Sequence, residues 1–283
     1  MKKRTIITSI LLIFIILTVI GFVSAGDTSK TSTTKLSGDD CASIVVQVSN
    51  NESVYSYRRD STSKVTINIK TEKWYGKKAI KEYKTQGSYF THSIITSNGW
   101  YVGMGGLRDG STMKKLEAYS KKIIRTGKIT ETNKKTIRKY MRSKKGHYII
   151  KNKYGTGYAY IYYYGTGKSV SFKLKPGRYM VVPNDPKYYK YGNYKKYSPD
   201  PVNASIKLAA SDKYGVNRRN IITYHIKITK RVSTIKIYAS NDTGILSGKP
   251  SSGSDPIKIF GKYKTQFLIA PFKTYIGMVK YTI

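Results

Sequence analysis

The sequence holds a single cysteine, Cys41, and its position makes it the first candidate for chemistry. It follows a polar stretch, residues 26–40, and precedes a run of strand-forming residues. If the chain is cut between Asp40 and Cys41, one residue carries both a thiol and a free α-amine. An α-amine titrates near pKa ~7.7–8.0, so at neutral pH part of it can accept the thiol proton. Cys41 would then supply nucleophile and base without any histidine.

The N-terminus has the three parts of a secretory signal. Basic residues 2–4 precede an apolar run over 6–23, and Val23-Ser24-Ala25 has the small residues of a cleavage site. We expect a signal peptide over 1–25 and a secreted, cell-surface-associated protein. Alternatively, the run stays uncleaved as an anchor, because about 18 apolar residues begin to span a bilayer. Residues 26–40 are polar and without period, which predicts a propeptide or linker.

The charge balance points to an anionic environment. The chain carries 52 Lys and Arg residues against 15 Asp and Glu, a net charge of +37. This indicates an anionic cell-wall polymer, an acidic glycan or acidic lipid headgroups as a partner, and export makes nucleic acid the least expected. A solvated surface adapted to a salty environment has the same composition. We expect contact with a membrane only through an uncleaved leader.

The few cysteines and histidines of the chain argue against a disulfide framework and against a metal site. One cysteine excludes an internal disulfide framework. One cysteine and three scattered histidines lack the spacing of a metal site, and no nucleotide-binding motif is present. We therefore expect no cofactor.

The elements around Cys41 predict a β-hairpin. Residues 42–49 alternate in a period of two, Asn50-Asn51 marks a turn, and Val54–Tyr57 resumes as a strand. Cys41 thus opens a strand, whereas papain-type nucleophiles open a helix.

The rest of the chain reads as strands, two helices and strands again. Helices are expected over 111–125 and 130–142, where apolar residues recur at helical spacing, and a short one over 203–213. Strands or strand pairs are expected at 65–70, 88–102, 147–152, 158–164, 169–174, 179–182, 221–228 and 234–239. This order predicts an α+β fold of antiparallel sheets.

Two stretches are assigned to loops or extensions. We expect residues 41–240 to form the main domain and residues 241–283 a linker followed by a C-terminal β extension of three short pieces. In residues 187–197 tyrosines alternate with lysines, in a chain with 27 tyrosines. Such a basic aromatic loop could stack on sugar rings or bases, or be an ordinary surface loop.

The stretch from Cys41 to Asp60 resembles the opening of the cysteine-type N-terminal nucleophile (Ntn) hydrolases. It resembles in particular the choloylglycine hydrolase, acid ceramidase and penicillin acyltransferase relatives. Those proteins begin Cys-Thr-Ser with aliphatic residues, and this chain has Cys-Ala-Ser-Ile-Val-Val over 41–46. The family aspartate falls where Asp60 stands. The family arginine, three residues earlier, is replaced by Tyr57, and two arginines follow it at 58 and 59.

The resemblance implies a fold and an activity. The fold is an Ntn-type αββα sandwich with antiparallel sheets, and autoprocessing exposes Cys41 as the N-terminus. The activity is hydrolysis of a non-peptide C–N amide, or transfer of its acyl group, through a thioester on Cys41. The positive charge favours an anionic or cell-wall amide as the substrate.

The resemblance also implies roles for five other residues. Asp60 would contact the α-amine, and Arg58 or Arg59 would lie beside the thiol and stabilise the thiolate. In a second, weaker likeness over Lys175–Asn184, Asn184 would donate its side-chain amide to the oxyanion. Arg218 would serve as the family's late active-site arginine.

Two other functions fit part of the sequence. A papain-like or transglutaminase-like peptidase would pair Cys41 with His147, in a Gly-His-Tyr-Ile-Ile strand. A non-enzymatic, basic wall-binding or adhesin-like surface protein would explain the charge, tyrosines and export, but not the position of Cys41. Residues 37–40 do not form the lipobox of a lipoprotein. A lone cysteine that opens a strand can also be a buried small hydrophobe.

Overall fold

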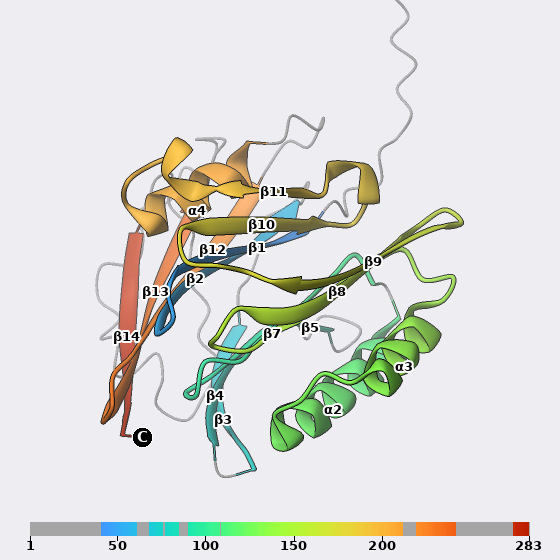
Figure 1. Ribbon diagram of the computed structural model, residues 1–283, viewed down its shortest axis with the longest axis horizontal. Coiled ribbons are helices and arrows are strands. Elements are labelled where there is room, and N and C mark those ends of the chain that lie inside the picture. The colour runs from blue at the N-terminus through green and yellow to red at the C-terminus, as the bar shows by residue number, and fades with distance from the viewer. Residues whose placement is uncertain are drawn as a thin grey trace, which may run out of the picture. The chain divides into compact units, whose positions relative to one another are not determined.

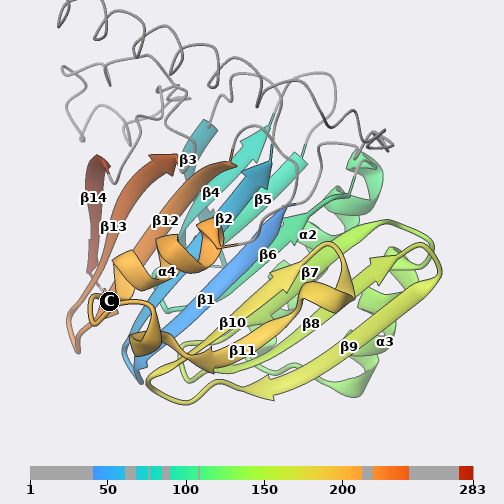
Figure 2. The same ribbon diagram turned by 90° about the horizontal axis from the view of Figure 1, so that it is seen from above.

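The computed structural model describes residues 41–60, 68–75, 77–84, 90–107, 109–211, 219–241 and 274–282. They form two seven-stranded sheets, in which every recorded strand pair is antiparallel, and three α-helices (Figures 1 and 2). The expected α+β class with antiparallel sheets is confirmed. The predicted signal peptide, the propeptide or linker and the linker after residue 241 lie outside the described residues.

The first sheet, sheet A, holds the hairpin that begins at Cys41. Its strands, in spatial order, are β11 (Lys190–Asn193), β10 (Arg178–Pro183), β1 (Ala42–Ser49), β2 (Glu52–Asp60), β12 (Arg219–Ile228), β13 (Val232–Asn241) and β14 (Thr274–Thr282). β1 therefore lies inside the sheet, between its hairpin partner β2 and the distant β10. At the edge, β14 pairs with β13, so sheet A includes part of the segment assigned to a C-terminal extension.

The second sheet, sheet B, follows the chain strand by strand. Its strands, in order, are β3 (Asn68–Trp74), β4 (Lys77–Lys84), β5 (Phe90–Thr96), β6 (Tyr101–Gly105), β7 (Gly146–Lys151), β8 (Thr156–Tyr163) and β9 (Thr166–Lys173). Two helices are inserted between the neighbouring strands β6 and β7: α2 (Gly110–Thr126) and α3 (Glu131–Met141). Asp109 caps α2, and Thr130 begins α3 with a capping box, which satisfies backbone N–H groups at both starts.

Strand alternation produces three apolar layers. Val45 of β1 and Ile149 of β7 belong to the layer between the two sheets. Residues one position away point outward: Val46 packs in the layer under α4 (Pro201–Ala210) and Ile150 in the layer under α2 and α3. The described elements thus stack as α4, sheet A, sheet B, and the α2–α3 pair (Figure 1). No helix of the described part is both long and apolar enough to cross a membrane.

Most expected elements are present, with two omissions. The sequence did not predict β4, whose lysine-rich residues hide its alternation, although Ala79 and Ile80 are buried. The expected loop at 187–197 contains the strand β11 between two 3₁₀ turns, Pro186–Tyr188 and Tyr194–Lys196. The helix expected over 203–213 begins at Pro201 instead, because Asp200 caps it, and ends at Ala210.

Candidate active site around Cys41

Cys41 lies at the end of the inter-sheet layer, directly before β1. Its side chain is buried, with 7% of its surface exposed, and belongs to the apolar layer between the sheets. The next residue, Ala42, pairs with Pro183 on one side and with Arg58 on the other. Cys41 therefore lies beside the strand end that leads into Asn184 and the strand end that leads to Asp60.

Sheet B approaches Cys41 through a glycine. A Cβ atom placed on Gly105 of β6 would lie 2.9 Å from Cys41 Cβ, and it would also collide with the His147 ring. Cys41 and His147 thus pack against the same glycine from different sheets. Only glycine leaves room there for both side chains.

A hydrogen-bonded chain of side chains crosses between the sheets beside Cys41. His147 Nε2 lies 2.8 Å from Ser43 Oγ, and His147 Nδ1 lies 2.7 Å from Asn184 Oδ1. Nδ1–H donates to the amide oxygen, so Nε2 accepts from the serine hydroxyl. The Asn184 amide packs against Gly106, where a Cβ atom would collide with its nitrogen, carbon and oxygen alike. Both ring nitrogens of His147 therefore have partners other than the thiol.

Burial keeps the His147 ring neutral. The ring is completely buried, and desolvation of the charged form lowers the pKa of His147 to about 4. The hydrogen bond to Asn184 opposes this shift, and the nearby charge of Arg58 adds to it. At neutral pH the imidazole holds Ser43 and Asn184 in place without bearing a charge.

Arg58 and Asp60 form a buried ion pair at the end of β2. Arg58 Nε lies 3.4 Å from Asp60 Oδ1, with side-chain exposures of 1% and 0%. Arg58 also donates from Nη1 to the carbonyl oxygen of Ala209 in α4, at 3.2 Å. The sequence did not predict this pair: Arg58 was expected beside the thiol, but it pairs with Asp60 on the α4 side of the sheet, opposite to the face that carries the Cys41 side chain.

Arg59 occupies the other face of β2. Successive strand residues point to opposite faces, so Arg59 shares the inter-sheet face with Tyr57, and it is half-buried. The register Ala42–Arg58 places Arg59 beside Cys41. The two arginines thus divide between an ion pair with Asp60 and the sheet face that carries the thiol.

The remaining predicted residue, Arg218, lies outside the described residues. The next residue along, Arg219, begins β12 and pairs with Asp60 across the sheet. Of the predicted site residues, Cys41, Asp60, Arg58, Arg59 and Asn184 are therefore brought to one end of sheet A.

Two residues of this end were not predicted as part of an N-terminal-nucleophile site. Ser43 was matched to the family's opening Cys-Thr-Ser without a role. His147 was placed in a strand that resembles the family's central strand pair, and its only proposed role was as the partner of a rival peptidase. The alternation Tyr101-Val102-Gly103-Met104-Gly105 was the available signal, because it places both glycines on one face of β6. Within the described residues, no three His, Cys, Asp or Glu side chains gather as metal ligands.

Comparisons with known proteins add no family to this geometry. No family model matches the sequence, and no curated protein is similar to it. Any function must therefore be argued from the arrangement around Cys41 itself.

Proposed function

We propose that this chain is an exported amidohydrolase of the N-terminal-nucleophile type, with Cys41 as its nucleophile. The position of Cys41 carries the proposal: it opens a central strand and faces the second sheet, between Asn184 and the end of β2. The stacking of helices outside two antiparallel sheets also supports it, because this is the layer order that the resemblance implies.

The chemistry begins with a cut at the Asp40–Cys41 bond. The new α-amine takes the thiol proton, and the thiolate attacks the amide carbonyl to form a C–S bond. Collapse of the intermediate breaks the C–N bond, and the proton passes from the α-amine to the leaving amine. Water then attacks the thioester, which releases the acid and returns the proton to the thiol.

The neighbouring side chains have distinct roles in this scheme. Asp60, neutralised in part by Arg58, lies at the adjacent strand end and orients the new α-amine. Arg59, on the same sheet face as Cys41, favours the thiolate. Asn184 donates to the oxyanion through its amide nitrogen. His147 is a positioning residue, because its hydrogen bond to Oδ1 fixes which end of that amide faces the site.

The intact mass of the secreted protein tests the proposal most directly. We expect a mature chain that begins at Cys41, and Cys41→Ala should retain residues N-terminal to it. A mature wild-type chain that begins at Gly26, with Cys41 internal, would rule the proposal out.

Asn184→Ala tests the oxyanion role separately from folding. Loss of one such donor lowers kcat by about 10²–10³-fold, with a small change in KM. Asn193→Ala, a half-buried asparagine on the edge strand β11, is the matched control and should leave kcat within about twofold. Equal kcat values for the two variants would remove Asn184 from the mechanism.

One observation favours a second candidate, a Cys–His–Asn peptidase. His147 lies against the same glycine as Cys41 and hydrogen-bonds to Asn184, which is the order of groups in that constellation. Against it, His147 Nε2 is bonded to Ser43, and Cys41 opens a strand. Ser43→Ala distinguishes the two. If the enzyme is an N-terminal-nucleophile hydrolase in which Ser43 positions His147, the substitution should lower its activity. If it is a Cys–His peptidase, the substitution should free Nε2 for the thiol and raise its activity.

A further inference from the structure

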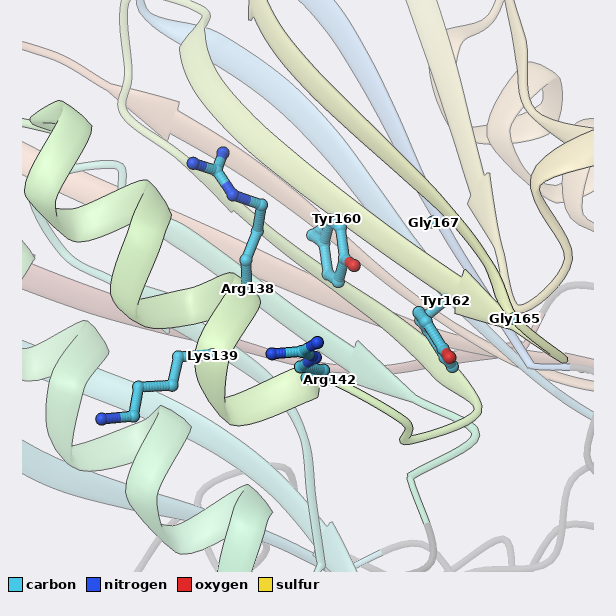
Figure 3. A pocket seen from close by; sticks show the side chains of 7 residues that line it. All are labelled: Arg138, Lys139, Arg142, Tyr160, Tyr162, Gly165 and Gly167. Atoms are coloured by element: carbon cyan, nitrogen blue, oxygen red, sulfur yellow. The ribbon is translucent and has the colours of Figure 1, made fainter.

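A second candidate site lies on the helix side of sheet B, the face opposite to the layer that holds Cys41. A cavity of about 500 Å³ opens beside α3, lined by Arg138, Lys139, Arg142, Tyr160, Tyr162, Gly165 and Gly167. Figure 3 shows the basic side chains coming from α3 and the residue directly after it, and the tyrosines from β8. Alternation explains the separation, because Ala159 and Ile161 of the same strand face the inter-sheet layer instead. The cavity shares no residue with the Cys41 site.

Two arginines of this cavity could contact an anion. Arg138 lies on α3 and Arg142, four residues later, is the C-cap residue directly after it. Arg138 contacts only neutral hydroxyls, Tyr158 Oη and Ser169 Oγ, both at 3.4 Å from its Nη1. Within the part of the chain that the structure describes, neither arginine has an ion-pair partner. Planar guanidinium groups bind carboxylate and phosphate oxygens with two parallel hydrogen bonds.

The stretch of chain that forms this cavity carries far more basic than acidic residues. The sequence has no Asp or Glu between Glu131 and Asp185, a span that covers most of α3 and all of β7, β8 and β9. The two flanking acids are themselves paired, Glu131 with Lys134 at 2.6 Å and Asp185 with Lys187 at 3.2 Å. Asp109 pairs with Lys144 next to Arg142, at 3.1 Å, but the region keeps an excess of positive charge, which attracts anions.

The tyrosines supply ring faces next to the arginines. Tyr160 and Tyr162 are two residues apart on β8, so their rings lie on one face of the strand. A Cβ atom on Gly167 of β9 would lie 2.7 Å from Tyr160 Oη, so the glycine makes room for the hydroxyl end of this buried side chain. Burial raises the pKa of Tyr160, which keeps its hydroxyl protonated and able to donate.

We propose that this cavity binds an anionic saccharide. Its carboxylate or phosphate would lie on Arg138 and Arg142, and its sugar ring would pack on Tyr160 and Tyr162. The basic side chains and two tyrosine hydroxyls of the lining favour a saccharide over single-stranded nucleic acid, because sugar hydroxyls need hydrogen-bond partners whereas stacked bases need only ring faces. The site would hold the exported protein on an acidic polysaccharide or a phosphate-bearing wall polymer, and it does not depend on catalysis by Cys41.

Binding of defined polymers to the purified secreted protein tests this site. The probes are polygalacturonate for carboxylate, poly(glycerol phosphate) bearing glucosyl groups for phosphate, and dextran as an uncharged sugar. We expect Arg138→Gln/Arg142→Gln to weaken binding of one or both anionic probes by about tenfold or more. Lys115→Gln/Lys122→Gln, which removes the same charge from the exposed face of α2, should change it by less than about twofold. Dextran should not bind measurably.

The tyrosines give a test that charge alone cannot pass. Tyr162→Ala leaves the charge unchanged and should weaken binding of the anionic saccharide by about fivefold or more. The probe that loses affinity identifies carboxylate or phosphate as the recognised group. Equal losses of affinity in the two double variants would overturn the site, because binding would then depend on the total charge of the protein and not on these two arginines. No effect of Tyr162→Ala, or tighter binding of a single-stranded oligonucleotide, would overturn the saccharide assignment.

Discussion

Each end of β1 makes a side-chain hydrogen bond to β7 of the other sheet, but the residues around the two bonds differ. At one end Ser43 bonds to His147, and at the other Gln47 Oε1 accepts from Lys151 Nζ at 2.6 Å. Between them Val45 and Ile149 belong to the inter-sheet layer. Each end thus places a buried titratable group of β7 against a polar group of β1.

The ends differ in whether a nucleophile lies next to the buried titratable group. Lys151 Nζ donates to Gln47, to Ser53 Oγ at 3.3 Å and to the carbonyl of Asn152 at 3.0 Å, which accounts for all three of its protons. Its ammonium also lies 5.2 Å from the ring of Tyr55. The Cys41 end instead joins a thiol, an asparagine amide and a glycine-lined approach. A buried, perturbed group is therefore not by itself a functional site: Lys151 has the stronger perturbation and the more complete structural role.

The largest expected effect is on amide turnover, which should depend on the Cys41 end of β1 and not on the Lys151 end. Cys41→Ala should abolish amide turnover, a loss of about 10³-fold or more, and should block labelling by thiol reagents. Lys151→Met should leave turnover of the folded protein unchanged within about threefold. Turnover and labelling of both variants, measured at matched folded fractions, check this contrast. Comparable loss in Lys151→Met would mean that the second end also serves the chemistry.

The next effect is the dependence of stability on alkaline pH. Burial lowers the pKa of Lys151 from 10.5 to about 7, so between these values the unfolded chain binds more protons than the folded one. Stability should therefore rise with pH across this window, by about 5 kcal/mol in full and about 2 kcal/mol between pH 7 and 9. Denaturant unfolding of wild type and Lys151→Met measures it: the variant should lose most of the slope. Lys122→Met, on the exposed face of α2, should keep it.

The Cys41 end should show a weaker effect of the same sign at acid pH. The pKa of His147 falls from 6.5 to about 4 on folding, so the unfolded chain binds more protons in this window. The free energy of unfolding should be unaffected by His147 above pH 6.5, and it should fall by about 3 kcal/mol as the pH drops to 4 and the unfolded chain takes up the proton. His147→Gln should remove that part of the slope in urea titrations. Urea titrations of a variant that replaces the partly buried His225, which is bonded to Glu52, provide the comparison with His147→Gln.

The smallest expected effect concerns the glycine that lets the sheets approach. Gly105→Ala introduces a Cβ at 2.9 Å from Cys41 Cβ, which should cost about 1–3 kcal/mol of unfolding free energy and slow thiol labelling. Gly127→Ala has open space around it but needs a left-handed backbone, with φ of +70°. It should cost stability without changing the labelling rate. Thermal unfolding and labelling kinetics together separate packing at the site from backbone strain elsewhere.

Local pattern was enough to predict the elements that carry the site. The alternation after Cys41 predicts β1, the helical spacing of apolar residues predicts α2 and α3, and the Asn50-Asn51 turn predicts the hairpin. The same reasoning failed for β4 and β11, which contain mostly polar residues and tyrosine and few aliphatic residues. In those strands pairing with a neighbour, rather than hydrophobic pattern, decides the structure.

The sequence by itself determined that one cysteine opens a strand, that an aspartate ends the next strand, and that the charge is strongly positive. Only the tertiary structure decided that β10 brings Asn184 beside Cys41, and that β7 brings His147 against the same glycine. It also divided Arg58 from Arg59 by sheet face, which sequence spacing had left open. The physical reason is that alternation and turns are local, whereas strand order and sheet-on-sheet packing depend on burial of residues more than a hundred positions apart.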